Sequence, residues 1–226
     1  MKGLNLMKNY SVIAFDLDGT LSDPAKGLIQ GFVYCFKKLG IPYDNEESLR
    51  RYIGPSLYEE WQEDFGFSHD EVNHAIETFR EYYNIYGWWD NTLYKGIPEM
   101  LAALKEAGKT VVLATSKPLD TAKNILELFN LTKYFDFVGG AGNHQNDQKW
   151  QVLKLSLESV GIDVADKASL ERCILVGDRK YDAEGAKIVG IDSMGVLYGH
   201  GTKEEIESSG FTLTAETVDD ILKILL

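Results

Sequence analysis

The sequence predicts an α/β protein in which helices surround a parallel sheet and a second, all-helical domain is inserted into the first. Short apolar runs alternate with helical patterns along most of the chain, and this alternation is typical of a parallel sheet. Each apolar run ends in glycine or polar residues, as buried strands do where they leave a sheet. One long stretch after the first run shows helical spacing alone, which indicates the inserted domain.

The first element expected is a buried strand over residues 12–15. From about residue 24 to residue 90, apolar side chains such as Leu28, Phe32 and Phe36 recur at helical spacing. Further helices are predicted there over residues 46–53, 57–65 and 70–86, after the capping candidates Asn45, Ser56 and Ser68. Residues 87–96 are expected to be a return linker that carries an aromatic cluster.

The rest of the chain predicts the core domain. Strands are expected over residues 110–114, 134–138 and 173–176. A helix is expected over residues 97–107, before the first of these strands, and another over residues 119–129, after it. The core domain should therefore comprise residues 1–22 and 91–226, and the helical domain residues 23–90.

Composition narrows the class of protein. With 226 residues, 44% of them hydrophobic, the chain can bury a sizeable core. The net charge of −12 disfavours broad contact with a nucleic acid polymer or an anionic membrane. The two cysteines are far apart, so neither a disulfide framework nor a zinc site is expected. Without an apolar segment long enough for a signal peptide or a membrane span, we expect a soluble, cytoplasmic protein.

Two pairs of carboxylates follow predicted strands. Asp16 and Asp18 follow the first strand, and Gly19 lets the chain turn away there, whereas Asp178 and Asp182 follow the last predicted strand and open a helix. Taken singly, a turn or an acidic first helical turn would explain each pair. Parallel strands end at one edge of a sheet, however, so four carboxylates should meet there and repel one another. Such an oxygen-rich site favours Mg²⁺.

A hydroxyl pair and a lysine complete the pattern. Thr115 and Ser116 end another predicted strand, and Lys149 opens a helix after a loop rich in glycine and asparagine. Separately these are an ordinary helix cap and a solvated lysine. Their order along the chain, an acid pair, then hydroxyls, then a lysine, then a second acid pair, is much more specific than any one of these signals.

In this order the motifs resemble those of the haloacid dehalogenase superfamily of phosphatases with an aspartate nucleophile. The resemblance is carried by residues 15–20, residues 113–116, Lys149 and residues 176–182. The helical segment between the first two motifs is similar to the cap of the phosphoglycolate phosphatase and 5′-nucleotidase branch. The resemblance implies a Rossmann-like core with an all-helical cap, and a phosphoric monoester hydrolase with Mg²⁺ as cofactor.

Residue roles follow from the same resemblance. It implies that Asp16 attacks phosphorus, while Asp18 protonates the leaving alcohol and then activates water. Thr115 and Lys149 would hold the phosphoryl oxygens.

The resemblance also implies a metal site. Mg²⁺ would be bound by the carboxylates of Asp16 and Asp178 and the backbone carbonyl of Asp18, with Asp182 in or near the site.

One departure and several alternatives remain. Lys149 is followed by Trp150, where many relatives have proline, and Lys154 is the nearest substitute for the lysine. A sugar phosphomutase or another phosphotransferase keeps both acids of the first motif, and a pyrophosphatase could use the same scaffold. A dehalogenase is disfavoured because its relatives lack the acid at the position of Asp18.

The substrate expected is a small phosphorylated metabolite: a nucleotide 5′-monophosphate, phosphoglycolate or a similar ester. Residues expected to contact it are Gly19, Thr20 and Ser116 in the core and Arg51 and Ser56 in the cap. Cap aromatics such as Tyr58 and Trp61 could stack on a base, although such residues more often belong to a small helical core. The chain is expected to be a monomer or a weak homodimer.

Overall fold

The computed structural model describes residues 8–54, 56–142 and 148–226. Within these residues six parallel strands form one sheet in the order β5-β4-β1-β6-β7-β8. The strands are β1 (Val12–Phe15), β4 (Thr110–Pro118), β5 (Phe137–Ala141), β6 (Cys173–Gly177), β7 (Asp192–Val196) and β8 (Leu213–Ala215). The order places β1 between β4, which carries Thr115, and β6, which leads into Asp178.

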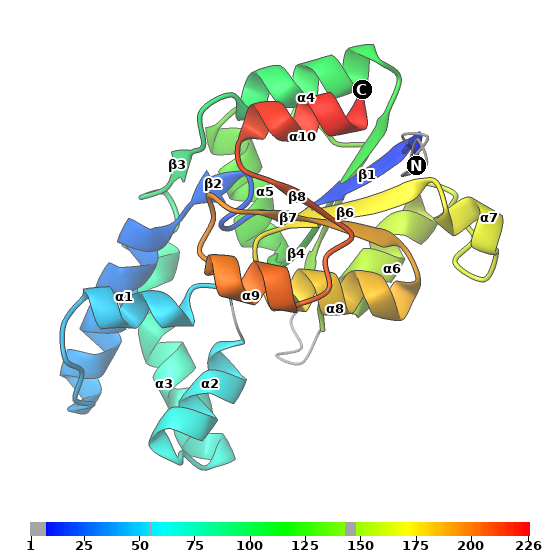
Figure 1. Cartoon of the computed structure of the whole chain (residues 1–226). Coiled ribbons are helices and arrows are strands. Elements are labelled where there is room, and N and C mark those ends of the chain that lie inside the picture. Colours follow the sequence, from blue (N-terminus) through cyan, green and yellow to red (C-terminus); the bar gives the residue numbers. More distant parts are fainter. Residues whose placement is uncertain (1–7, 55, 143–147) are drawn as a thin grey trace.

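Helices cover both faces of this sheet (Figure 1). On one face lie α4 (Ile97–Glu106), α5 (Leu119–Leu128) and α10 (Val218–Leu225). On the other lie α6 (Lys149–Ser159), α7 (Lys167–Leu170) and α8 (Lys180–Val189), and α9 (Lys203–Ser208) follows β7. The predicted α/β class, with a Rossmann-like parallel sheet, is confirmed.

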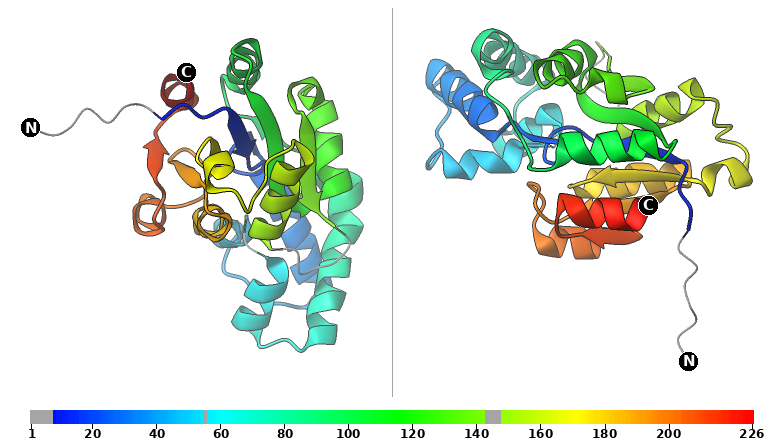
Figure 2. Two further views of the ribbon diagram at one scale, coloured as in Figure 1. Left: turned by 90° about the vertical axis from the view of Figure 1, so that its right-hand side faces the viewer. Right: turned by 90° about the horizontal axis from the view of Figure 1, so that it is seen from above.

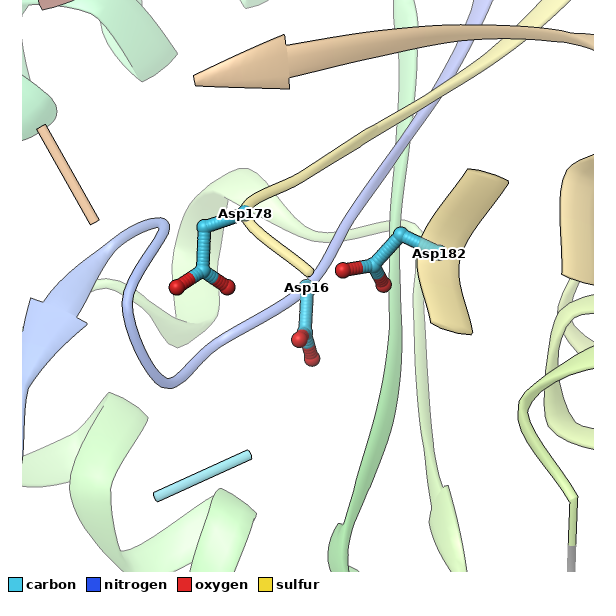
Figure 3. A group of neighbouring side chains, drawn as sticks. All are labelled: Asp16, Asp178 and Asp182. Carbon is cyan, nitrogen blue, oxygen red and sulfur yellow. The ribbon is translucent and has the colours of Figure 1, made fainter. Parts of the chain in front are cut away.

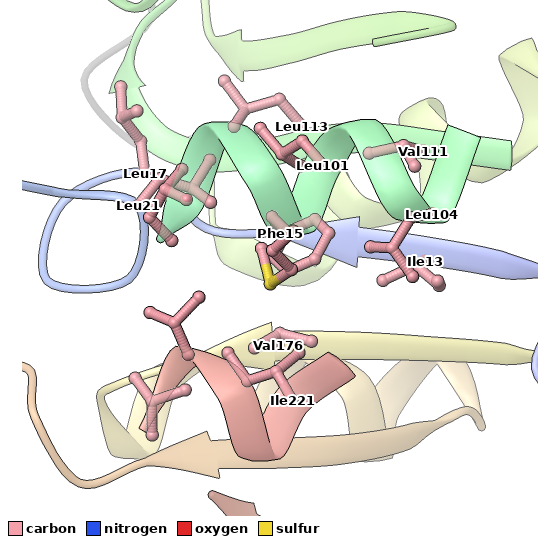
Figure 4. Packing of buried hydrophobic residues seen from close by; sticks show 14 of the residues in the cluster. Ile13, Phe15, Leu17, Leu21, Leu101, Leu104, Val111, Leu113, Val176 and Ile221 are labelled. Carbon is pink, nitrogen blue, oxygen red and sulfur yellow. The ribbon is translucent and has the colours of Figure 1, made fainter. Parts of the chain in front are cut away.

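Alternation along β1 explains the two layers. Ile13 and Phe15 point into the cluster that α4, α5 and α10 complete, where Phe15 packs with Leu101 and Ile221 (Figure 4). Val12 and Ala14 belong to the opposite cluster. Because β1 is buried on both faces, every one of its residues is apolar, as expected for a central parallel strand.

A group of helices, here called the helical insertion, lies between β1 and β4 in the chain. It comprises α1 (Ala25–Leu39), a 3₁₀ helix (Glu47–Tyr52), α2 (Leu57–Phe65), α3 (His69–Tyr82) and a π-helical turn (Tyr83–Gly87). These elements share a hydrophobic cluster of their own around the fully buried Trp61. Both views in Figure 2 place the insertion, coloured blue to cyan, at one end of the core. Trp61 is therefore a core residue of the insertion.

Several boundaries differ from the sequence expectation. The strand expected over residues 134–138 is β5 (Phe137–Ala141), preceded by a 3₁₀ turn, Thr132–Tyr134. Tyr134 and Phe135 lie at this turn and pack against the core, as the residues of a buried strand would. Their hydrophobic character alone therefore could not distinguish the turn from a strand. The helix expected over residues 46–53 is 3₁₀, and the one over residues 70–86 changes to π geometry after Tyr82.

The return linker contains a short strand. β3 (Thr92–Leu93) pairs antiparallel with β2 (Ser22–Asp23), so the two chain segments that enter and leave the helical insertion lie side by side. Ser68 caps α3 through a capping box with Glu71, as the sequence predicted for that helix start. Across the described residues, no helix combines the length and apolar character that crossing a membrane requires.

Candidate active site

The site lies where the carboxyl ends of three adjacent strands meet. Asp16 follows β1 directly, and its N–H donates to the carbonyl of Val176 on β6 at 2.9 Å. Asp178 follows β6, and Thr115 and Lys117 lie near the end of β4. The neighbouring positions of β4, β1 and β6 therefore bring three of the four motifs to one edge of the sheet.

Three carboxylates form a compact cluster. Asp16, Asp178 and Asp182 each offer an oxygen, and these oxygens lie within 4.8 Å of one another (Figure 3). Asp178 and Asp182 are each only 1% exposed. Asp178 Oδ1 is buried and has no hydrogen-bond partner among the described residues. Closely spaced, buried oxygen donors of this kind are able to bind a divalent cation.

Gly19 makes this close approach possible. Its φ of +79° is a conformation that side-chain-bearing residues rarely adopt, and a Cβ atom there would lie 2.0 Å from Asp178 Oδ2. The turn after β1 thus requires glycine both for its backbone angle and for the space that Asp178 occupies.

Lys149 partly neutralises the cluster. Its Nζ lies 2.8 Å from Asp16 Oδ1 and 2.8 Å from Asp182 Oδ1, and it donates to the carbonyl of Ala114 at 3.0 Å. Burial opposes its charge, but the two carboxylates outweigh that effect and raise the pKa of Lys149. Lys154 is about half exposed and lies 3.9 Å from Glu158 instead. Of the two lysines considered, the structure brings Lys149 to the cluster.

Asp178, which precedes α8, and Asp182 in its first turn have raised pKa values. Burial, followed by the charges of Asp182 and Asp16, raises the pKa of Asp178 well above its usual range. Burial also raises the pKa of Asp182 to about 6, even though Lys149 acts in the opposite direction. The cluster therefore holds more negative charge than Lys149 alone can balance, which favours a bound cation.

Asp18 has a separate cationic partner that the sequence analysis missed. Lys117 Nζ lies 2.6 Å from Asp18 Oδ2, and its side chain is only 5% exposed. Lys117 Nζ also lies 5.2 Å from the centre of the Tyr83 ring, and Tyr83 belongs to the helical insertion. The strand was expected to end at Ala114, but β4 continues to Pro118. Extending the two-residue alternation from Thr115 would have placed Lys117 on the same face.

The other residues expected at the site occupy different environments. Thr115 is 2% exposed, and its hydroxyl accepts from the N–H of Lys117 at 3.2 Å. Thr20 is fully buried, and its hydroxyl lacks a hydrogen-bond partner among the described residues. Ser116 and Ser56 are exposed. Arg51 is paired with Asp64 and donates to Tyr52, both within the helical insertion, so its charge already has a partner there.

A loop after β7 also contacts the site, although sequence reasoning gave it no role. The N–H of His200 donates to Asp178 Oδ2 at 2.7 Å, and the hydroxyl of Tyr198 donates to the carbonyl of Thr20 at 2.9 Å. No motif or charge pattern distinguishes this loop in the sequence, because a backbone N–H carries no residue-type signal. Pro55 and most of the glycine- and asparagine-rich loop before Lys149, residues 143–147, lie outside the described residues.

The family comparison covers most of the chain. A family model described as "Haloacid dehalogenase-like hydrolase" matches residues 13–196. This range runs from β1 to the end of β7 and contains the whole carboxylate cluster and Lys149.

Similar proteins include both hydrolases and a kinase. The chain is 32% identical to a 5′-nucleotidase of Pseudomonas aeruginosa, over 88% of each chain. It is 33% identical to the tyrosine-protein kinase PtkA of Mycobacterium tuberculosis, over 95% of this chain and 72% of the kinase. Its structure is similar to that of a Clostridium difficile protein named "Putative Phosphatase", with a TM-score of 0.84, 38% identity, and coverage of 97% and 100% of the two chains.

The raised pKa values predict a pH-dependent stability. Between the ordinary value of 3.8 and about 6, the folded protein holds a proton on Asp182 that the unfolded chain releases. In EDTA, the free energy of unfolding of the wild type should therefore fall, relative to Asp182→Asn, as the pH rises through that window. The expected change is on the order of a few kcal/mol. Urea denaturation at stepped pH measures it, and parallel curves for the two proteins would contradict it.

The buried pair of Lys117 and Asp18 predicts strong coupling. Lys117→Met should lower the free energy of unfolding by about 3–5 kcal/mol, because it leaves the Asp18 carboxylate without its partner. Adding Asp18→Asn should restore much of the loss, since no unpaired charge remains. A double-mutant cycle by urea denaturation measures the coupling. Additive losses would show that the two side chains do not interact in solution.

Proposed function

Because the chain belongs to the haloacid dehalogenase-like hydrolase family and is a phosphoric monoester hydrolase, we propose that it cleaves its substrate through an aspartyl phosphate on Asp16. The observation that carries this proposal is the position of Asp16. Its carboxylate lies beside Asp178 and Asp182, within 2.8 Å of the Lys149 ammonium, at the end of a rigid central strand. A nucleophile held there would meet the phosphoryl group among cationic and hydroxyl donors.

Binding of the phosphoryl group is assigned to Lys149 and Thr115. Lys149 is buried and fixed by three oxygen atoms, so its ammonium needs little reorganisation to hold a phosphoryl oxygen. Thr115 is buried at the end of β4, next to the strand that carries Asp16. Gly19, Thr20 and Ser116 are proposed to contact the same group.

The proposed cofactor is Mg²⁺. The donor set fits it, because Asp16, Asp178 and Asp182 offer closely spaced carboxylate oxygens and one buried oxygen of Asp178 lacks a hydrogen bond among the described residues. The carbonyl of Asp18 is proposed as a further ligand. When bound, Mg²⁺ would neutralise the repulsion between the carboxylates and the phosphate ester.

Proton transfer is assigned to Asp18. It would protonate the leaving alcohol and afterwards accept a proton from the attacking water, so that one carboxyl group serves both halves of the reaction. The contact with Lys117 fixes the side chain of Asp18 at the boundary with the helical insertion. An orientation fixed before the substrate arrives reduces the cost of reaching the transition state.

Residues 23–90 are proposed to act as a cap that excludes water and selects the leaving group. A nucleotide 5′-monophosphate is the substrate class that the P. aeruginosa relative supports, and phosphoglycolate is a smaller candidate. Ser56 and Arg51 remain proposed cap contacts. The experiment that tests the function is phosphate release from nucleotides, phosphoglycolate, sugar phosphates and pyrophosphate, with Mg²⁺ or with EDTA.

A phosphotransferase is the second candidate function, and the similarity to PtkA favours it. The same aspartyl phosphate could pass its phosphoryl group to a tyrosine hydroxyl instead of water. Release of inorganic phosphate supports the phosphatase, whereas label moving from a phosphate donor to a protein tyrosine supports the transferase.

Chelation should remove the activity. We expect EDTA to lower the rate of phosphate release by at least about 100-fold, since the carboxylates would then repel the ester. Added Mg²⁺ should restore the rate, and Ca²⁺ should not, because its looser coordination would misplace Asp16. Full activity after chelation and dialysis would contradict the assigned cofactor.

The two acids of the first motif should differ in their effects. Asp16→Asn should stop turnover of every ester, because an amide forms no acyl phosphate. Asp18→Asn should slow turnover by about 10²–10⁴-fold while leaving the nucleophile in place. With an aryl phosphate, whose leaving group hardly needs a proton, the first step should survive better than the second. Intact-protein mass spectrometry after an acid quench should then find a phosphate adduct on Asp16 of Asp18→Asn.

The same measurement contains its control. Asp16→Asn treated with the aryl phosphate should carry no adduct. An adduct on another residue, or normal activity in Asp16→Asn, would refute the assignment of the nucleophile.

A further inference from the structure

Arg179 lies between two acids of the cluster in sequence, and its backbone N–H donates to Asp182 Oδ2 at 3.1 Å, but its side chain makes its contacts elsewhere. It precedes α8, between Asp178 and Asp182. Its Nε lies 2.9 Å from Glu205 Oε1 on α9, and its Nη1 donates to the carbonyl of Ile53 in the helical insertion. One guanidinium group therefore joins the core to the insertion immediately beside the carboxylate cluster.

The chain of the insertion passes directly against this side chain. Gly54 has a φ of +100°, and a Cβ atom there would lie 3.1 Å from both Cγ and Nη1 of Arg179. A second contact follows on α2, where the Tyr181 hydroxyl donates to Glu60 Oε1 at 3.4 Å. The start of α8 thus contacts the insertion on both sides of Ser56, at Ile53 before it and at Glu60 after it.

The core side of the contact is well anchored. The Arg179 side chain is 14% exposed and that of Glu205 is 20% exposed. Glu205 Oε1 also accepts from the N–H of Lys180 at 2.9 Å, which ties α9 to the first turn of α8. Arginine can serve Glu205 and Ile53 together because its donors point in different directions from one rigid plane, whereas a lysine presents a single nitrogen.

We propose that Arg179 is a positioning residue that holds the segment carrying Ile53, Gly54 and Ser56 against the start of α8, and thereby determines how tightly the substrate's leaving group is bound. The substrate part of this inference rests on the proposed phosphatase function. Arg179 reaches the reaction through the backbone of the insertion and contacts none of the three clustered carboxylates through its guanidinium group in the described contacts.

The test compares Arg179→Met with Arg179→Lys and with Glu205→Gln as a matched control. Arg179→Met removes both contacts, and Arg179→Lys keeps a cation for Glu205 but loses the second donor. Glu205→Gln weakens the ion pair between Arg179 and residue 205 within the core, and it leaves the Arg179 donor to the Ile53 carbonyl in place. If the ion pair between Arg179 and Glu205 only stabilises the packing of α8 against α9, all three variants should behave alike.

Two readouts separate positioning from a structural role. In both Arg179 variants, the KM for adenosine 5′-monophosphate should rise about tenfold, while kcat for 4-nitrophenyl phosphate stays within about threefold, because the lost interaction binds the leaving group. Amide hydrogen exchange of residues 53–58 should become about tenfold faster, since the hydrogen bond to Ile53 is lost. Glu205→Gln should leave that exchange unchanged.

The results that would overturn the positioning role of Arg179 differ from those that would overturn the proposed phosphatase function. Unchanged exchange in the Arg179 variants, or equal losses on both esters, would overturn the positioning role. A wild-type protein that hydrolyses neither ester would overturn the proposed phosphatase function and the substrate part of this inference. The exchange measurement on the same variants would still decide whether Arg179 holds the segment.

Discussion

The repulsion among three buried carboxylates is the constraint on which the rest of this structure depends. Asp16, Asp178 and Asp182 lie within 4.8 Å of one another, and burial strengthens their interaction. Lys149, in the first turn of α6, balances part of that charge. It can do so only because α6 packs beside α8 on the same face of the sheet. The parallel register of β1 with β6 and the tight turn at Gly19 are therefore electrostatic requirements as well as features of the fold.

A second constraint acts at the boundary with the helical insertion. The insertion has its own hydrophobic cluster around Trp61, distinct from the two clusters of the sheet. Among the described residues, its polar contacts with the core include three close to the carboxylate cluster: Lys117 joins Asp18 to the ring of Tyr83, Arg179 donates to the carbonyl of Ile53, and Tyr181 donates to Glu60. Both bridging cations come from the core and sit within two residues of a residue assigned to catalysis or metal binding. Movement of the insertion would therefore change the surroundings of Asp18, the proposed general acid, and of the start of α8.

Much of the core was predictable from the sequence because its signals are local. The sequence analysis expected the strands β1, β4, β5 and β6, and it placed the first residue of β1, β4 and β6 correctly. These strands were recognisable because a strand buried on both faces, such as Val12–Phe15, is apolar throughout. β7 and β8 had no such signal: Ser193 and Gly195 interrupt the apolar pattern of β7, and β8 has three residues. The shift of β5 and the 3₁₀ and π turns arose because packing, which the pattern does not encode, decides between a strand, a turn and a helix.

For the site, the sequence by itself determined which residue types lie at the strand ends and helix starts: the acids after β1 and β6, the hydroxyls of β4, and the lysine that opens α6. The parallel direction of the strands is sufficient to predict that such residues gather at one edge. Only the tertiary structure decided which of them touch. It placed Lys149 rather than Lys154 beside Asp16, gave Asp18 a separate partner in Lys117, and paired Arg51 within the insertion. The physical reason is that an ion pair depends on distances of a few ångströms between segments far apart in the chain, and those distances are set by packing.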